Sequence, residues 1–234
     1  MLKSVMDQMT VVKDTLGKTG KYWIAFVGDS ITSAEWVHPN WREIVEYVLK
    51  EELQPKFKDW RVPSWGIRCF NYGFDGASSR DIAKLASDGT LKTRLDLVIV
   101  MIGANDKIKR VSLMEHKGNI GKIIEALKPV ETVWATDIRP NNLRAAKTYK
   151  DFVEEDRKYK WGMTKFIDTY AEFDKLELNK LYTFKYKDKP DFWHPNQLGN
   201  AYIAKIILRE AFGIEFDPEK YIRDTLSGEK YPGY

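Results

Sequence analysis

The sequence predicts an α/β protein of three layers, in which helices cover both faces of a parallel sheet. Short apolar runs alternate with longer amphipathic ones along the 234 residues, and strands that alternate with helices are typical of parallel sheets, whose neighbours need crossover connections. The run DLVIVMIG at residues 96–103 is apolar at almost every position, as a central strand buried on both faces requires. No repeat or low-complexity linker interrupts the chain, so we expect one domain over residues 1–234.

Five short apolar runs predict the strands of this sheet. Their length and their regular separation by amphipathic segments favour strands over buried helices. We expect the strands at residues 22–27, 67–72, 95–102, 132–136 and 164–168.

Amphipathic segments fill the intervals between these strands. In residues 40–53 the large apolar side chains recur on one face, which suits a helix packed against a sheet. That face holds Trp41, Ile44, Val45, Val48 and Leu49. Further helices are expected at residues 79–86, 112–127, 142–159 and 195–212.

Three segments are less regular. Residues 1–20 predict a short amphipathic helix that ends at Gly17 or Gly20. Residues 170–190 are expected to form a lid, or a short helix with a loop. The tail, residues 216–234, is expected to lie over the surface or on a neighbouring molecule.

Composition narrows the class of protein. Lys and Arg outnumber Asp and Glu by only 38 to 34, and both signs are interspersed, so nucleic acid is not an expected partner. No apolar run has the length of a membrane span, and a single cysteine forms no internal disulfide. The first twenty residues carry no signal-peptide block. We expect a cytoplasmic protein, although a chain from which a leader had been removed would look the same.

Polar and glycine residues follow several of the predicted strands. Gly28-Asp29-Ser30 follows the first, the stretch NYGFDGASS follows the second, and Gly103-Ala104-Asn105-Asp106 follows the third. The segment DFWHPN comes after the last strand and its long loop. Ligands of open α/β sheets bind beyond the carboxyl ends of the strands, so we expect these four segments to converge there.

Together the segments contain the parts of a nucleophilic site. A serine hydroxyl such as that of Ser30 needs a base, and the base must be oriented by a third group. Asp191 and His194 have the spacing for that, because side chains three residues apart at a helix entrance lie on the same side. The N–H groups of Ser30 and Gly76 and the amide of Asn105 are candidate donors to an oxyanion.

The other two histidines fit the role of base less well. His116 falls within a predicted helix, and we expect it on a solvated surface. His38 has no carboxylate at a comparable spacing, so it is either a substrate contact or a helix-start residue. With one solitary cysteine and no paired histidine ligands, the sequence predicts no metal and no cofactor.

The four segments, in this order, resemble the hallmark blocks of the SGNH hydrolases, also called the GDSL esterase/lipase family. The resemblance implies a flavodoxin-like fold with five parallel strands, and a serine esterase that acts through an acyl-enzyme. It implies Ser30 as nucleophile, His194 as base and Asp191 as its partner, with Ser30, Gly76 and Asn105 as the oxyanion hole. Ile31 replaces the family's leucine, and Gly73 is a rival for Gly76.

Local sequence distinguishes this reading from others. An α/β-hydrolase elbow needs Gly-x-Ser-x-Gly, whereas Thr32 stands at the place of the second glycine. Two further possibilities stay open: a ligand-binding module on this fold that has lost activity, and a lysophospholipase or thioesterase that uses the same site. An anion-binding flavodoxin-like protein ranks last, because no glycine-rich phosphate cradle is present.

The substrate is less constrained than the reaction. Tryptophans beside the site segments suggest either a cleft that stacks sugars or ordinary packing; they are Trp36, Trp41, Trp65 and Trp193. Arg139 is either a contact for an anionic substrate or a solvent-facing side chain, and Asp29 and His38 complete the candidate substrate contacts. Asp75, next to Gly76, would oppose negative charge on an oxyanion. We expect an ester of a small molecule or saccharide, with an acetyl ester of a carbohydrate as the leading case.

Overall fold

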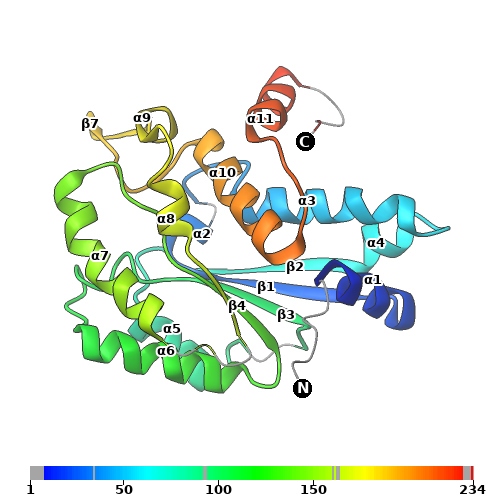
Figure 1. The fold of residues 1–234 in the computed structure, drawn as a ribbon, viewed down its shortest axis with the longest axis horizontal. Coiled ribbons are helices and arrows are strands. Elements are labelled where there is room, and N and C mark those ends of the chain that lie inside the picture. The colour runs from blue at the N-terminus through cyan, green and yellow to red at the C-terminus, as the bar shows by residue number, and fades with distance from the viewer. Residues whose placement is uncertain are drawn as a thin grey trace.

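The computed structural model describes residues 8–33, 35–91, 94–159, 161, 164–228 and 233. Its centre is a parallel sheet with the strand order β2-β1-β3-β4-β5 (Figure 1). All five expected strands are confirmed, with ends shifted by one or two residues. They are β1 (Tyr22–Gly28), β2 (Ile67–Gly73), β3 (Leu97–Met101), β4 (Glu131–Ala135) and β5 (Lys165–Ile167).

Side chains alternate between the two faces of the sheet and build two cores. In β1, Ile24 and Phe26 belong to one core and Ala25 and Val27 to the other, as the period of a strand dictates. Helices α1 (Gln8–Thr19), α3 (Trp41–Leu53) and α10 (Gln197–Ile207) cover the first face. Helices α5 (Ser79–Ser87) and α6 (Leu113–Leu127) cover the second, and α7 (Leu143–Lys158) lies beside α6. The three-layer α/β prediction is therefore confirmed.

Several short elements were not expected from the sequence. A four-residue helix, α2 (Ser30–Ser33), starts where β1 ends. A 3-10 turn (Gln54–Lys56) and α4 (Arg61–Gly66) precede β2. The expected helix at 195–212 ends as α10 at Ile207 and continues as a π-helical turn, Leu208–Phe212.

The two less regular segments contain secondary structure in their described residues. Residues 169–190 contain α8 (Thr169–Phe173), α9 (Leu178–Leu181) and a small hairpin of β6 (Lys185–Tyr186) and β7 (Lys189–Pro190). In the tail, α11 (Pro218–Ser227) packs against α10 (Figure 1), and residues 229–232 and 234 lie outside the described residues. In the part of the chain that the structure describes, no helix has both the length and the apolar character needed to span a membrane.

The strand order indicates a binding site at the carboxyl ends of the strands. The order 2-1-3-4-5 reverses direction between β1 and β3, and the crevice at such a switch point lies at the carboxyl ends of the strands. Ser30 follows β1 and Asn105 follows β3. The topology thus brings two of the predicted site residues to the same crevice.

Candidate active site

Ser30 stands at the tip of a tight turn between β1 and α2. A Cβ on Gly28 would lie 2.4 Å from Thr32 Oγ1 and 2.5 Å from the Met101 carbonyl oxygen, so this position accommodates glycine alone. Asp29 follows and accepts a hydrogen bond from the Ile31 N–H at 3.0 Å. The turn therefore holds the serine at the first residue of α2, at the edge of the crevice.

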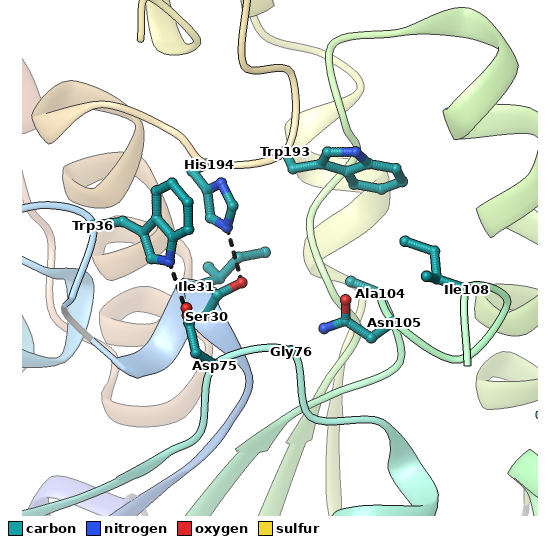
Figure 2. Close-up of a pocket in the computed structure, with 10 residues that line it drawn as sticks. All are labelled: Ser30, Ile31, Trp36, Asp75, Gly76, Ala104, Asn105, Ile108, Trp193 and His194. Atoms are coloured by element: carbon teal, nitrogen blue, oxygen red, sulfur yellow. Dashed lines mark hydrogen bonds between the residues drawn. The ribbon is translucent and has the colours of Figure 1, made fainter. Parts of the chain in front are cut away.

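The three predicted catalytic side chains meet. The Nε2 atom of His194 lies 2.9 Å from Ser30 Oγ (Figure 2). The Nδ1 atom of His194 lies 2.7 Å from Asp191 Oδ2. Both distances are within hydrogen-bond reach. Serine, imidazole and carboxylate thus form a continuous chain in which a proton on Nδ1 leaves Nε2 free to accept the Ser30 proton.

Backbone N–H groups two and three residues further along the chain hold the Asp191 carboxylate. Its Oδ1 atom accepts hydrogen bonds from the N–H groups of Trp193 and His194, at 2.8 and 3.0 Å. Burial alone would raise the pKa of Asp191, but these bonds and that from the His194 ring hold its pKa below the ordinary value. The carboxylate is therefore ionised at neutral pH and faces the imidazole with Oδ2.

Residues 170–190 support the loop that carries the base. Asn196, the cap of α10, donates from its side chain to the Lys180 carbonyl and to Thr183 Oγ1, and from its backbone to the Leu181 carbonyl. The Asp191 N–H donates to the Phe184 carbonyl at 2.9 Å. The segment expected to form a lid, or a short helix with a loop, thus contains short helices and supports Asp191 and His194.

The candidate oxyanion donors line the same crevice. Gly76 has a φ of 69°, which favours glycine, and lines the pocket with Ser30 and Asn105. The amide nitrogen of Asn105 donates to the Ala77 carbonyl at 3.0 Å and to Asp29 Oδ2 at 3.2 Å, on the side of Gly76 in Figure 2. Gly73 instead ends β2 against the backbone of Ser33, which favours Gly76 for the role.

These groups surround a pocket of about 220 Å³. Trp36 forms one wall, and Trp193 and Ile108 form the opposite wall (Figure 2). Ile108 is 65% exposed, so this wall opens toward solvent. The pocket is small, largely apolar, and faced by the Ser30 hydroxyl.

Comparison with known proteins decides the family. A family model described as GDSL-like Lipase/Acylhydrolase matches residues 24–207. The chain belongs to this family. The match contains the strand that leads to Ser30 as well as Asp191 and His194, so it confirms the resemblance inferred from the four sequence segments.

Three proteins illustrate what this chain is similar to. An acetylxylan esterase of Geobacillus stearothermophilus is 26% identical over 217 residues, which are 80% of this chain and 92% of that protein. The structure of a mutant acetyl-xylooligosaccharide esterase from Geobacillus has a TM-score of 0.62 at 23% identity, covering 83% of this chain and 95% of that one. A lipase/acylhydrolase from Enterococcus faecalis has a TM-score of 0.62 at 19% identity, covering 82% and 96%. These structures share the flavodoxin-like fold of this GDSL-family hydrolase.

A stacked tryptophan covers the base of this GDSL-family site. The rings of Trp36 and His194 are nearly parallel, with centroids 3.9 Å apart and an interplanar angle of 4°. The indole N–H donates to Asp75 Oδ1 at 2.8 Å. Trp36 therefore links the segment after the nucleophile, the turn of Gly76 and the imidazole. It also occupies one oxygen of Asp75, the carboxylate expected to oppose an oxyanion.

Replacing Trp36 is expected to slow catalysis. Trp36→Ala removes a stacked contact worth about 1 kcal/mol, and we expect kcat/KM for a small aryl acetate to fall about fivefold. Trp36→Phe keeps a ring over His194 and should lose less than the alanine variant. Steady-state kinetics of the two variants measure the effect; an alanine variant as active as the wild type would show that the stack does not position the base.

Asp29 does not contact solvent. Its exposed fraction is zero, and burial raises its pKa to about 7. The expectation that Asp29 contacts substrate is therefore wrong for this structure. Asp29 lies beneath the site, where it orients the amide of Asn105 and the backbone of α2.

His116 is buried, against the expectation of a solvated surface. Its ring is fully enclosed, with Nδ1 2.7 Å from Asp106 Oδ2 and Nε2 3.0 Å from Asp156 Oδ1. Burial lowers the pKa of His116, but the hydrogen bonds with the two carboxylates outweigh burial and raise its pKa to about 9. Asp106 also accepts from the Ser79 backbone and hydroxyl. A buried imidazolium thus joins α5, α6 and α7 beneath the loop that carries Asn105.

Protein stability is expected to fall as pH rises through this histidine's titration. Native His116 keeps its proton up to pH about 9, whereas unfolded histidine loses it near pH 6.5, so its contribution is complete below about 6.5 and is lost through about 9. The raised pKa of Asp29 adds a separate effect: as pH rises from about 4 to about 7, the stability of the protein also falls, because the native state binds a proton that the unfolded state has already lost. We expect the free energy of unfolding to drop by on the order of 1–3 kcal/mol between pH 6.5 and 9.

Chemical denaturation at several pH values measures this dependence. His116→Gln should flatten the fall between pH 6.5 and 9, while His38→Gln, at a histidine whose side chain is 70% exposed, should keep the wild-type slope. An identical slope in all three proteins would remove His116 as its source.

The remaining predicted contacts lie elsewhere. His38 is exposed beside Glu43, with 3.3 Å between Nδ1 and Oε2. Arg139 is mostly buried and pairs with Asp174 at 2.7 Å, in a separate pocket with Asn141. The Arg139 side chain is only 17% exposed, so the expectation of a solvent-facing arginine is wrong. Arg139 does not line the catalytic pocket, and its contact with an anionic substrate stays a prediction.

Two of the four tryptophans are also removed from the site. Trp41 is fully buried in the first core. Trp65 is 61% exposed and lies against Trp60 and Arg61 on α4. Only Trp36 and Trp193 of this set line the catalytic pocket.

Sequence reasoning missed two functional features. The helical period places His116 with Asn119, Ile120 and Ile123 on one face of α6, which is the buried face, so a signal for its burial was present. Ile108 lies in the loop after β3, and no periodic signal marks it as a pocket wall.

Proposed function

We propose that this protein is a serine esterase that removes short acyl groups, foremost acetyl, from carbohydrate esters through an acyl-enzyme. The observation that carries the proposal is the continuous hydrogen-bonded chain from Ser30 Oγ through His194 to Asp191 at the rim of a small pocket. A hydroxyl activated in this way is a nucleophile for acyl transfer.

The acylation step follows from this geometry. Ser30 Oγ attacks the ester carbonyl carbon while its proton passes to His194 Nε2, and Asp191 stabilises the resulting imidazolium through Nδ1. When the tetrahedral intermediate collapses, the bond to the alcohol oxygen breaks and that oxygen takes the proton from Nε2. The alcohol leaves, and the acyl group remains on Ser30 as an ester.

Deacylation repeats the sequence with water. A water molecule attacks the acyl carbon while His194 Nε2 takes its proton. When the tetrahedral intermediate collapses, the bond to Ser30 Oγ breaks, Oγ takes the proton from Nε2, and the carboxylic acid leaves. In both halves the oxyanion is stabilised by N–H donors of Ser30 and Gly76 and by Asn105. Loss of one such donor raises the barrier by about 3 kcal/mol. The side-chain amide of Asn105 donates to the Ala77 carbonyl and to Asp29 in this structure, and in the reaction one of its N–H groups would also donate to the oxyanion.

Three observations support a short acyl group on a saccharide. The pocket of about 220 Å³ is smaller than the roughly 300–1,000 Å³ typical of drug-sized ligands. Its walls include Trp36 and Trp193, and indole faces pack well against flat apolar surfaces. The third observation is the similarity to an acetylxylan esterase, whose alignment extends over 80% of this chain.

A substrate panel tests the proposal. p-Nitrophenyl esters from acetate to palmitate, beside acetylated xylo-oligosaccharides, separate acyl length from the nature of the alcohol. We expect the highest kcat/KM with acetate and release of acetate from the oligosaccharides. A maximum at long acyl chains would indicate a lipase or lysophospholipase instead, and no turnover of any ester would indicate a ligand-binding module.

A further inference from the structure

A second hollow adjoins the catalytic pocket. It has a volume of about 310 Å³ and shares three lining residues with the catalytic pocket: Ala104, Ile108 and Trp193. Trp193 and Ile108 thus stand between the two spaces, at the side of the site opposite Trp36 (Figure 2). We call this hollow the α7 groove, because α7 forms its outer side.

The floor of the α7 groove is apolar and partly aromatic. Phe192 and Trp193 line it with ring centroids 5.2 Å apart, and Ala145 and Tyr149 face it from α7. The Tyr149 residue is only 3% exposed, and its hydroxyl has no hydrogen-bond partner among the residues that the structure describes. The groove therefore has an apolar and partly aromatic lining, and the Tyr149 hydroxyl is buried rather than exposed in it.

The charges at the α7 groove are of one sign. Lys107 and Arg144 both line it, and no carboxylate of the described chain is among its lining residues. Neither side chain forms a salt bridge with a described residue, whereas Arg139 and Arg157 are paired with Asp174 and Asp168. Two unpaired cations beside an aromatic surface suit a ligand with an apolar or pyranose face and a negative charge.

We propose that the α7 groove binds the alcohol part of the ester and selects substrates whose alcohol carries a carboxylate. The inference rests on the proposed esterase function, since it assigns a subsite to the same reaction. The acyl group occupies the small pocket beside Ser30, and the alcohol extends past Ile108 and Trp193 to Lys107 and Arg144. The catalytic pocket is lined by the carboxylate of Asp75 and by no Lys or Arg of the described residues, so a preference for an anionic alcohol would have to come from the groove.

A matched pair of esters tests the charge preference. 4-Acetoxybenzoate carries a carboxylate on the alcohol part, and 4-acetoxybenzamide is its neutral counterpart of similar size. The measured quantity is the ratio of their kcat/KM values in the wild type and in the double variant Lys107→Gln, Arg144→Gln. Comparing ratios cancels the different intrinsic reactivities of the two esters. Lys107 and Arg144 are both exposed, and an exposed ion pair is worth up to about 1 kcal/mol. We therefore expect the loss of both pairs to lower the anion-to-amide ratio about fivefold in the double variant.

Controls separate this effect from general changes. Lys13 is exposed on α1 and does not line the α7 groove, so Lys13→Gln should keep the wild-type ratio. In the wild type the ratio should also fall as salt is raised to about 0.5 M, because exposed charges are screened.

The outcomes are distinct for the two proposals. If both esters are hydrolysed and the double variant keeps the wild-type ratio, the carboxylate subsite is wrong while the esterase stands. If neither ester is hydrolysed and no acyl-enzyme forms, the esterase proposal itself fails.

Discussion

Ser30→Ala is expected to lower kcat/KM for an acetyl ester by about 10⁴-fold or more, as the loss of a nucleophile does in other serine hydrolases. The variant leaves His194 and Asp191 in place but removes the only atom on which the acyl group is held in the proposed reaction. Because the serine lies at a turn whose shape depends on Gly28 and Asp29, the fold should persist, with an unchanged unfolding transition.

A matched serine provides the control for this loss. Ser227→Ala removes a hydroxyl from the end of α11, where it donates to the Asp224 carbonyl, and should retain full activity. Residual activity of Ser30→Ala within tenfold of the wild type would mean that another group carries out the reaction.

Asp191→Asn is expected to lower kcat by about 10³- to 10⁴-fold, because it enforces the wrong tautomer of His194. Asp191 Oδ1 accepts two backbone N–H groups, so the oxygen of an asparagine is held at that position. Its NH₂ group then faces His194 Nδ1 and donates to it. The imidazole proton is forced onto Nε2, which no longer accepts the proton of Ser30.

An aspartate-to-asparagine change at a neighbouring position separates the effect of losing a negative charge from the effect of the wrong His194 tautomer. Asp188→Asn, at the exposed turn of the β6–β7 hairpin, removes one negative charge three residues away and should leave kcat within about twofold. A loss of less than tenfold in Asp191→Asn, measured with an aryl acetate, would mean that this carboxylate does not set the orientation of the base.

The strands and the catalytic trio are the parts that the sequence predicts best. Buried parallel strands such as β3 are marked by continuous apolar runs, because both of their faces pack against helices. The base was found by elimination among three histidines and by the three-residue spacing of Asp191 and His194. Convergence at the sheet edge then follows from the parallel topology, since β1 and β3 deliver Ser30 and Asn105 to one crevice.

The interior polar groups were harder to predict. Aspartate is mostly exposed in proteins and histidine is of intermediate burial. Asp29 and His116 are both buried because partners elsewhere in the chain satisfy them: Asn105 for Asp29, and Asp106 and Asp156 for His116. Such pairings join residues up to 76 positions apart, and no local period records them. In α6 the helical period did place His116 on the buried face, and the type preference misled the expectation.

Short helices and contacts made by loops were also not predicted from the sequence. Helices α2, α8 and α9 have four or five residues, which is too few to show a helical period. The Trp36 stack on His194 depends on the path of a loop and on a bond to Asp75. These features arise from tertiary packing, so they become visible only in the folded chain.

In the proposed reaction one serine, Ser30, becomes covalently acylated. The direct measurement is intact-protein and peptide mass spectrometry after treatment with a fluorophosphonate, which traps an activated serine. We expect a single adduct on Ser30 that is absent in Ser30→Ala and forms much more slowly in Asp191→Asn. An adduct on a different serine, or an unmodified protein that still hydrolyses p-nitrophenyl acetate, would rule out Ser30 as the nucleophile.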